Sequence, residues 1–306
     1  MLESQGYHLF GTHKHGATKR CMWLRRALRG GDMCYKGTFY GIASHRCIQM
    51  TPSIHCNHEC IHCWRPFLDE VILEDFEWDP PSELIDGVLT EHRRILSGYG
   101  GSNKTDMERL REASVPKHVA ISLIGEPTLY PHLPEFIDEF NNMGLTTFLV
   151  TNGTNPDMLK KVRPTQCYVS INAPDKDLYE RVCQPKGDYW DRILKSLEVV
   201  AKMNVRRTIR LTIIKGVNML DPEGYAELIS LAKPDFIEVK SYMHLGSSRM
   251  RLCRENMASH DEIRVFAEEL ASFMDGYHIE DESELSRVIL ISNEDSLYNR
   301  SLDLEV

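Results

Sequence analysis

The sequence predicts an α/β protein built around a parallel sheet, either doubly wound or curled into a partial barrel. From residue 47 onward, strand-like apolar runs alternate six times with stretches of helical spacing. The chain has 306 residues, 42% of them hydrophobic, which suffices for one large domain. No run of about 18 apolar residues is present, so we expect no membrane contact.

The elements follow one another in a regular order. Strands are expected at residues 47–53, 118–127, 146–153, 167–174, 206–216 and 235–244, with one more at 287–292. Helices are expected at residues 18–31, 81–98, 133–144, 155–162, 189–204, 222–234 and 260–274. Gly144 and Pro234 supply typical helix stop signals. We therefore expect an N-terminal extension over residues 1–46, the main sheet over 47–280, and a C-terminal strand with an acidic tail over 281–306.

The charge is divided unevenly along the chain. The net charge is −9, but residues 1–65 carry nine Lys/Arg and three Asp/Glu, which leaves +6 there and −15 in the remainder. A basic segment on an acidic body is typical of a local contact with phosphates, although a solvated basic helix at 18–31 is the simpler explanation of the charge run alone. The N-terminus has no secretory h-region, so the nine cysteines indicate a reducing, cytoplasmic setting.

The most informative motif is "HCNHECIHCW", which places Cys56, Cys60 and Cys63 (the first triad) within eight residues. Three thiols at spacings of four and three can face one point, which leaves a metal site one protein ligand short. A [4Fe–4S] cluster with one open iron fits this pattern. Zinc completed by a neighbouring histidine is the alternative, although structural zinc sites usually pair two separated ligand clusters and no second C-x2-C is present. The candidate histidines are His55, His58 and His62.

Polar residues recur where the predicted strands stop. In a parallel barrel, chemistry takes place at the carboxyl ends of the strands. One such residue would be an ordinary turn former, but six in register predict the rim of a single site. In chain order after the first triad, these are Gly125-Glu126-Pro127, Thr151-Asn152-Gly153, Asn172, Lys215 and Lys240-Ser241.

The first triad at the end of a first strand, with Trp64 beside its last cysteine, resembles the signature of radical S-adenosylmethionine (SAM) enzymes. The resemblance implies a partial parallel (βα)6 radical-SAM barrel with an N-terminal cluster-binding extension. It also implies that the methionyl group of SAM chelates the open iron. "IGEP" resembles the family's Gly-Gly-Glu-Pro element, with Ile124 in place of the first Gly. The cofactor-binding residues implied in this way are Gly125, Glu126, Pro127, Asn152 and Asn172.

Upstream lie Cys21, Cys34 and Cys47 (the second triad), each thirteen residues from the next. Scattered structural cysteines are the simpler explanation of any three such residues. All three, however, precede the first triad in a basic segment, and none lies in a core-like apolar run. A second, auxiliary [4Fe–4S] cluster is therefore the better interpretation. Cys167, Cys183 and Cys253 fit neither spacing and are expected to be ordinary small hydrophobes.

The whole pattern resembles the tRNA 4-demethylwyosine synthase family, in the short archaeal-type form without a flavodoxin domain. The resembling segments, among them "CMWLRRAL", "KGTFYGIASHRCIQMTP" and "SLIGEPTLYP", span most of residues 20–256. The resemblance implies that N1-methylguanosine beside the anticodon of tRNA-Phe condenses with two carbons of pyruvate to form a third ring. The pyruvate carboxylate would be lost as formate or carbon dioxide. A separate one-electron donor is implied, and nothing requires more than a monomer.

Two lysines are candidate catalytic residues. Lys36, two residues after Cys34, is expected to approach pyruvate and could form a Schiff base. The open iron of the auxiliary cluster could instead chelate pyruvate directly, in which case a covalent lysine adduct is not required. Lys240, at a strand end, is a second candidate for contacting the cofactor or pyruvate, or an ion-pair partner for a nearby acid.

The basic residues of two segments are candidate RNA contacts, since the target base must leave the anticodon stack to enter the site. Tyr35, Phe39, Tyr40 and Trp64 could stack on a base, but core packing is the expected role of each. The candidate RNA-binding residues are Lys14, Lys19, Arg20, Arg25, Arg26, Arg29, Arg249, Arg251 and Arg254.

Two other functions fit part of the sequence. A radical enzyme with an auxiliary cluster could act on a peptide or a small molecule, and it would then lack salt-sensitive tRNA binding. A non-catalytic RNA adaptor could hold zinc at the first triad, and it would be colourless rather than brown. A hydrolase of the α/β type is disfavoured because the chain has no G-x-S-x-G motif.

Overall fold

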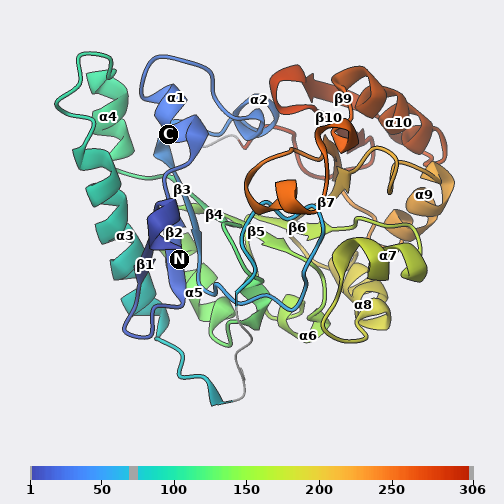
Figure 1. The fold of residues 1–306 in the computed structure, drawn as a ribbon, viewed down its shortest axis with the longest axis horizontal. Helices are drawn as coiled ribbons and strands as arrows, with labels where there is room; N and C mark the ends of the chain where they lie inside the picture. The colour runs from blue at the N-terminus through green and yellow to red at the C-terminus, as the bar shows by residue number, and fades with distance from the viewer. Residues whose placement is uncertain (1, 69–74, 303–306) are drawn as a thin grey trace.

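The computed structural model describes residues 2–68 and 75–302. Its centre is one sheet (Figure 1). The strands are β1 Tyr7–Phe10, β2 Gly16–Lys19, β3 Cys47–Thr51, β4 His118–Ile121, β5 Thr146–Thr151, β6 Gln166–Ser170, β7 Arg206–Ile213, β8 Phe236–Ser241, β9 Tyr277–Ser283 and β10 Val288–Asn293. Their order across the sheet is β1-β2-β3-β4-β5-β6-β7-β8-β10-β9.

The six central strands, β3 to β8, pair in parallel and in chain order, which confirms the six predicted strands. The order never reverses, so the sheet is not doubly wound, and of the two predicted arrangements the partial barrel is the correct one. Antiparallel strands extend both edges, β1 and β2 on one side and β10 and β9 on the other. No pairing joins the two edges among the described residues, so the barrel stays open.

All of the predicted helices are present, most of them shorter than predicted. The α-helices are α1 Met22–Ala27, α2 Tyr35–Tyr40, α3 Pro81–Ser97, α4 Met107–Ala113, α5 Leu133–Asn142, α6 Pro156–Leu159, α7 Lys176–Cys183, α8 Trp190–Val200, α9 Pro222–Ser230 and α10 His260–Ser272. Helices α2, α4 and α7 and strands β1, β2 and β9 were not predicted. In Figure 1, α3 and α4 lie beside β1 and β2, and α7 to α10 gather at the opposite side of the sheet.

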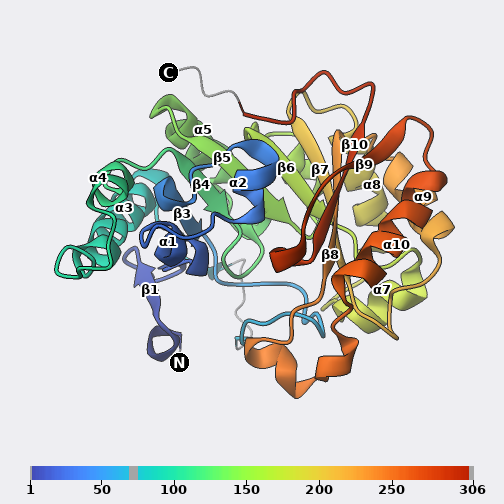
Figure 2. The ribbon, with the colours of Figure 1, turned by 90° about the horizontal axis from the view of Figure 1, so that it is seen from above.

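The two faces of the sheet pack against different partners. Successive strand residues point to opposite faces, so Leu149 joins the main core beneath α3 and α5 to α10, whereas its neighbour Phe148 joins a second cluster. In that second cluster Phe39 and Tyr40 of α2 pack against Phe148 and other strand residues. Both are fully buried, which confirms core packing for these two aromatics. Figure 2 shows α2 lying over the middle of the sheet.

The C-terminal residues return to α2. The Leu302 amide donates a 3.0 Å hydrogen bond to the Tyr40 carbonyl at the end of this helix, and the Arg206 guanidinium donates to the Arg300 carbonyl at 2.7 Å. The tail thus fastens the N-terminal extension to the sheet. The three-part division at residues 46 and 280 stays a prediction, and residues 303–306 of the expected acidic tail lie outside the described part.

Candidate active site

A cavity of about 530 Å³ lies at the carboxyl ends of the parallel strands. Both cysteine triads line it, together with Lys36, Lys240 and the predicted Gly125, Glu126, Asn152 and Asn172. Three rim residues of the sequence analysis are not in the lining. Pro127 is buried at the start of a short 3-10 helix, Gly153 is buried just after β5, and Lys215 forms an exposed ion pair with Glu262 of α10. Including Lys215 in the site was therefore wrong, because it lies beyond the end of β7 and pairs with α10, whereas Arg210 and Thr212 of β7 line the cavity.

The first triad occupies the loop that follows β3. Burial raises the pKa of the Cys56 thiol, and the neighbouring Cys60 thiol raises it further. Cys63 behaves in the same way, although Arg65 lowers its pKa in part. The three thiols are thus close enough for each to disfavour ionisation of the others. A bound cationic cluster would instead favour ionisation, because it binds the thiolate forms. The soft sulfur donors on one wall of an open cavity fit a cluster with three protein ligands.

Backbone contacts hold this loop in place. Arg251 donates to two of its carbonyls, that of Ile61 at 3.1 Å and that of Cys63. The Glu126 amide donates to the His55 carbonyl at 2.7 Å. Gly125 has φ +75°, and a Cβ added there would lie 2.2 Å from the Ser53 carbonyl oxygen. Only glycine allows β4 to end this close to the loop.

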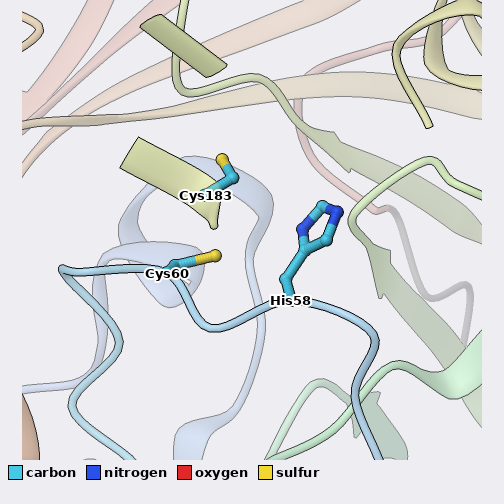
Figure 3. A group of neighbouring side chains, drawn as sticks. All are labelled: His58, Cys60 and Cys183. Carbon is cyan, nitrogen blue, oxygen red and sulfur yellow. The ribbon is translucent and has the colours of Figure 1, made fainter. Parts of the chain in front are cut away.

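A neighbour of the first triad was not evident from the sequence. Cys183 of α7 is buried beside Cys60 and His58, with their ligand atoms within 4.8 Å of one another (Figure 3). A hydrogen bond with Cys183 is the largest cause that raises the pKa of Cys60. His58 bonds through Nε2 to the Tyr179 hydroxyl at 2.8 Å, and burial lowers its pKa to about 4. A neutral histidine and two thiols could also hold zinc, but this group differs from the zinc site considered from the sequence, which combined Cys56, Cys60 and Cys63 with a histidine and did not include Cys183.

The second triad gathers from three elements. Cys21 and Cys34 precede α1 and α2, and Cys47 is the first residue of β3. Burial raises the pKa of the Cys47 thiol, and Cys34 and Cys21 raise it further, which places all three thiols close together. The Ser44 hydroxyl donates to the Cys34 sulfur at 3.2 Å and accepts from the Cys34 amide at 2.9 Å. Three convergent thiols on the cavity wall match the donor set of the first triad.

Glu126 links the ends of β4 and β5. Its buried carboxylate accepts from the Thr151 hydroxyl at 2.6 Å, the Asn152 amide at 2.7 Å, and both the amide and hydroxyl of Thr128. Burial raises its pKa, and these donors lower it in part. The Asn152 side chain donates to Asn57 at 2.8 Å, so the loop of the first triad also contacts β5 through Asn57, a residue that sequence reasoning missed.

Asn172 follows β6 and lines the same cavity. Its side-chain oxygen accepts from the Thr212 amide at 2.9 Å, and its carbonyl accepts from the buried Asn218 at 2.8 Å. The side-chain amide nitrogen of Asn172 forms none of the hydrogen bonds found in the described part of the chain. This group can therefore donate to a molecule in the cavity.

The two candidate lysines approach the cavity from different elements. Lys36 Nζ lies 4.7 Å from the Phe148 ring centroid and 4.3 Å from that of Tyr168. Lys240 Nζ donates to the Ser286 carbonyl at 2.7 Å. Burial lowers the pKa of each to about 8, and Arg210 contributes to both shifts. Neither lysine forms an ion pair among the described residues, so the ion-pair interpretation of Lys240 was wrong.

A buried ion pair lies beneath these lysines. Arg210 of β7 donates to Glu238 of β8 through Nε at 2.9 Å and Nη2 at 2.7 Å. Glu238 also accepts from the Tyr35 and Tyr40 hydroxyls, at 3.2 and 2.9 Å. Burial opposes the charged form of Arg210, but Glu238 outweighs it, so the pKa of Arg210 lies above its usual value. This pair was not predicted because its members are 28 residues apart and meet only through strand pairing.

The predicted RNA contacts do not all face solvent. Arg251 is directed inward, where it holds the loop of the first triad and lies 4.3 Å from the Phe67 ring. Lys19 is partly buried over the Tyr7 ring at 4.2 Å. The exposed candidates for RNA contact are Lys14, Arg20, Arg25, Arg26, Arg29, Arg249 and Arg254.

No helix in the described part of the chain has the length and apolar character needed to cross a membrane.

Comparisons with known proteins give one consistent result. Residues 50–229 match the Radical SAM superfamily, and residues 231–293 match a family described as wyosine base formation. The chain is 47% identical to an S-adenosyl-L-methionine-dependent tRNA 4-demethylwyosine synthase of Pyrococcus abyssi, over 96% of this chain and 88% of that protein. It is 43% identical to the synthase of the same name from Methanocaldococcus jannaschii, over 99% and 97%.

Solved structures agree with these matches. A TYW1 structure with a lysine–pyruvate adduct bound superimposes with a TM-score of 0.90 at 42% identity, covering 98% of this chain and 97% of that one. A crystal structure of archaeal TYW1 gives a TM-score of 0.82 at 39% identity, with the same coverage. The fold and the sequence of this chain are therefore similar to those proteins over nearly their whole length.

Proposed function

Because this chain belongs to the tRNA 4-demethylwyosine synthase family, and is therefore a radical SAM enzyme that modifies tRNA, we propose how its residues divide the reaction. Family membership decides against both the peptide-acting enzyme and the zinc-binding RNA adaptor. We propose that the substrates are N1-methylguanosine beside the anticodon of tRNA-Phe and pyruvate. The product is the tricyclic base 4-demethylwyosine, formed with loss of the pyruvate carboxylate.

Radical SAM chemistry uses one [4Fe–4S] cluster and SAM. Cys56, Cys60 and Cys63 would hold the cluster, and the amide of Asn172 and the Gly125–Glu126 turn would contact SAM. When bound, this pair supplies the hydrogen-abstracting chemistry that acts on the N1-methyl group. The protein positions both and excludes water, and the hydrogen-bonded loop of the first triad holds the cluster ligands in place for this.

The second triad is proposed to hold an auxiliary [4Fe–4S] cluster. Support comes from the convergence of Cys21, Cys34 and Cys47 on the wall that also carries Lys36. This assigns the N-terminal extension to pyruvate and the barrel to SAM. The target base would then enter between them.

Lys36 is the residue proposed to bind pyruvate covalently. The observation that carries this assignment is the position of its Nζ, which lines the cavity against two aromatic rings and forms no ion pair among the described residues. The lysine–pyruvate adduct bound in the similar TYW1 structure is consistent with it. The Nζ lone pair attacks C2 of pyruvate and forms a C–N bond. The keto oxygen leaves as water, taking one proton from nitrogen and one from solvent, and a protonated imine remains.

The exposed basic residues around α1 are proposed to bind the tRNA backbone. Arg20, Arg25, Arg26 and Arg29 lie on the segment that carries Cys21, so backbone contacts there would direct a flipped base toward the cavity. A separate one-electron donor is proposed to reduce the first cluster. We further propose that the enzyme acts as a monomer in the cytoplasm.

Reductive trapping tests the assignment of Lys36. The anaerobically reconstituted enzyme is mixed with pyruvate and cyanoborohydride, which converts an imine to a stable amine, and the modified peptide is identified by mass spectrometry. We expect one reduced pyruvate on the peptide that contains Lys36 and none in Lys36→Arg. The matched control is Lys240→Arg, which should be modified normally at Lys36.

Three results would count against the proposal. An adduct on Lys240, an adduct that survives Lys36→Arg, or no adduct alongside full tRNA modification would each remove Lys36 from this role. The last result would favour direct chelation of pyruvate by the auxiliary cluster. Iron content of a Cys21/Cys34/Cys47→Ala variant tests the second cluster separately, with a fall from about eight to about four irons expected.

A further inference from the structure

One edge of the Arg210 guanidinium faces the cavity without a partner. Nε and Nη2 are engaged with Glu238, and Nη2 also donates to the Tyr35 hydroxyl at 2.7 Å. Nη1 has no hydrogen-bond partner within residues 2–68 and 75–302. The Arg210 side chain is 16% exposed whereas that of Glu238 is 0% exposed, and Arg210 lines the cavity. The free edge therefore points to where a ligand would lie.

Arg210 and Lys36 share one aromatic ring. The Arg210 Cζ lies 4.7 Å from the Tyr168 ring centroid, and Lys36 Nζ lies 4.3 Å from it. In an imine of pyruvate, a carboxylate oxygen lies roughly 3 Å from the lysine nitrogen, and a hydrogen bond adds roughly 3 Å more. A separation of this order suits two cations placed around the same ring. The carboxylate of pyruvate at Lys36 can therefore reach Nη1.

The chemistry of Arg210 matches a carboxylate. A guanidinium stays charged at any physiological pH and presents rigid, planar donors to anions. Glu238 and Tyr35 fix its orientation in advance, so little side-chain freedom is lost on binding. Of the other cations that line the cavity, Lys240 is already bonded to the Ser286 carbonyl, and Arg65 donates to the Ser122 carbonyl at 2.7 Å. The protonated imine and the carboxylate carry opposite charges, so pyruvate adds no net charge to the site.

We propose that Arg210 binds the carboxylate of pyruvate held at Lys36 and thereby selects an α-keto acid over an uncharged ketone. The proposal rests on the assignment of Lys36 above and names a further substrate-binding residue for the same reaction. Glu238 is a positioning residue in this scheme, since it acts through Arg210.

Trapping with two ligands tests the selection. Cyanoborohydride trapping at Lys36 is measured against the concentration of pyruvate and of pyruvamide, its uncharged analogue, in the reconstituted enzyme without SAM. We expect the wild type to reach half-saturation at a roughly 10- to 100-fold lower concentration of pyruvate than of pyruvamide, the usual effect of one charge-assisted hydrogen bond. In Arg210→Met the preference should fall to about onefold because only pyruvate loses affinity.

The chain offers a matched control. Arg207 of β7 forms the same kind of pair with Asp235, the residue before β8, at 2.7 Å, and it does not line the cavity. Arg207→Met should keep the preference for pyruvate. If Arg210→Met does not fold, as judged by thermal melting, Arg210→Met/Glu238→Gln removes both buried charges and should show the same loss. Glu238→Gln alone should retain a preference for pyruvate.

The outcomes separate the two proposals. If the wild type forms no adduct at Lys36, the assignment of Lys36 fails, and the proposed role of Arg210 fails with it. If the adduct forms but Arg210→Met discriminates like the wild type, Arg210 does not bind the carboxylate. The inference is also overturned if Lys240→Met abolishes the preference while Arg210→Met keeps it.

Discussion

Replacing Gly125 by alanine should dislodge the loop of the first triad. Gly125 adopts φ +75°, and a Cβ there would meet the Ser53 carbonyl oxygen at 2.2 Å and the His55 carbonyl oxygen at 2.7 Å. Both contacts are backbone atoms of the loop that leads to Cys56, so no flexible side chain can move aside. The loop must retreat by roughly 1 Å to reach an ordinary contact distance.

The cost follows from three contributions. An L-residue in the left-handed region costs roughly 1–2 kcal/mol. Overpacking against backbone adds roughly 1–3 kcal/mol, and loss of the bond from the Glu126 amide to the His55 carbonyl adds about 1 kcal/mol. Together they give roughly 3–6 kcal/mol, which corresponds to a fall in Tm of roughly 10 °C for a chain of this size.

Gly144 provides the matched control because it has φ +77° and no atom within 4 Å of an added Cβ. Gly144→Ala should lower Tm by only roughly 3 °C. Gly125→Ala should also lose about four irons after anaerobic reconstitution and cleave SAM roughly 100-fold more slowly. If Gly125→Ala melts like Gly144→Ala and holds its full iron, the reasoning from close approach is wrong.

Three further outcomes are expected. Arg251→Met should lower iron content and SAM cleavage while leaving the salt dependence of tRNA binding unchanged, as measured by filter binding; a change in the salt slope would instead indicate a phosphate contact. Arg25→Gln and Arg29→Gln should each reduce that slope by about 0.7–0.9, with pyruvate trapping unaffected. His92 bonds to the Ala113 carbonyl at 2.9 Å, and burial lowers its pKa below the usual 6.5, so the folded state binds fewer protons than the unfolded state. The free energy of unfolding should therefore fall as the pH drops below about 6.5, and urea titrations should show a smaller fall in His92→Gln.

The parts of the fold that the sequence predicted are those with a strong periodic signal. The six parallel strands are rich in apolar and β-branched residues and are mostly buried, which is the signal that identified them. Strand β9, "YHIEDES", was missed because it is a polar edge strand, alternately half-buried and exposed. Helix α2, "YKGTFY", has six residues with a glycine and a threonine, so packing against Phe148 and its neighbours, rather than helix propensity, stabilises it.

In the candidate site, too, the predicted residues are those with a signal in the local sequence. Ligand spacing along the chain located the first triad, and position relative to the motif suggested the second, because both depend on local sequence. Arg210, Glu238 and Cys183 were missed because their partners are far apart in sequence and are joined by the register of β7 and β8 or by the packing of α7. Arg251 was assigned to RNA because its charge is visible in the sequence, whereas the loop carbonyl groups to which it donates are not.

Helix α2 connects the second triad, Arg210 and Lys36 structurally. Three consecutive residues at its start face three different partners. Cys34 joins the second triad, Tyr35 bonds to Arg210 and Glu238, and Lys36 reaches the cavity. A shift of α2 along the sheet would therefore move Cys34, the Tyr35 hydroxyl that bonds to Arg210, and Lys36 together. The C-terminal tail, through Leu302 and Arg300, holds the far end of this helix and opposes such a shift. The geometry of the proposed pyruvate site thus depends on contacts made more than 250 residues later in the chain.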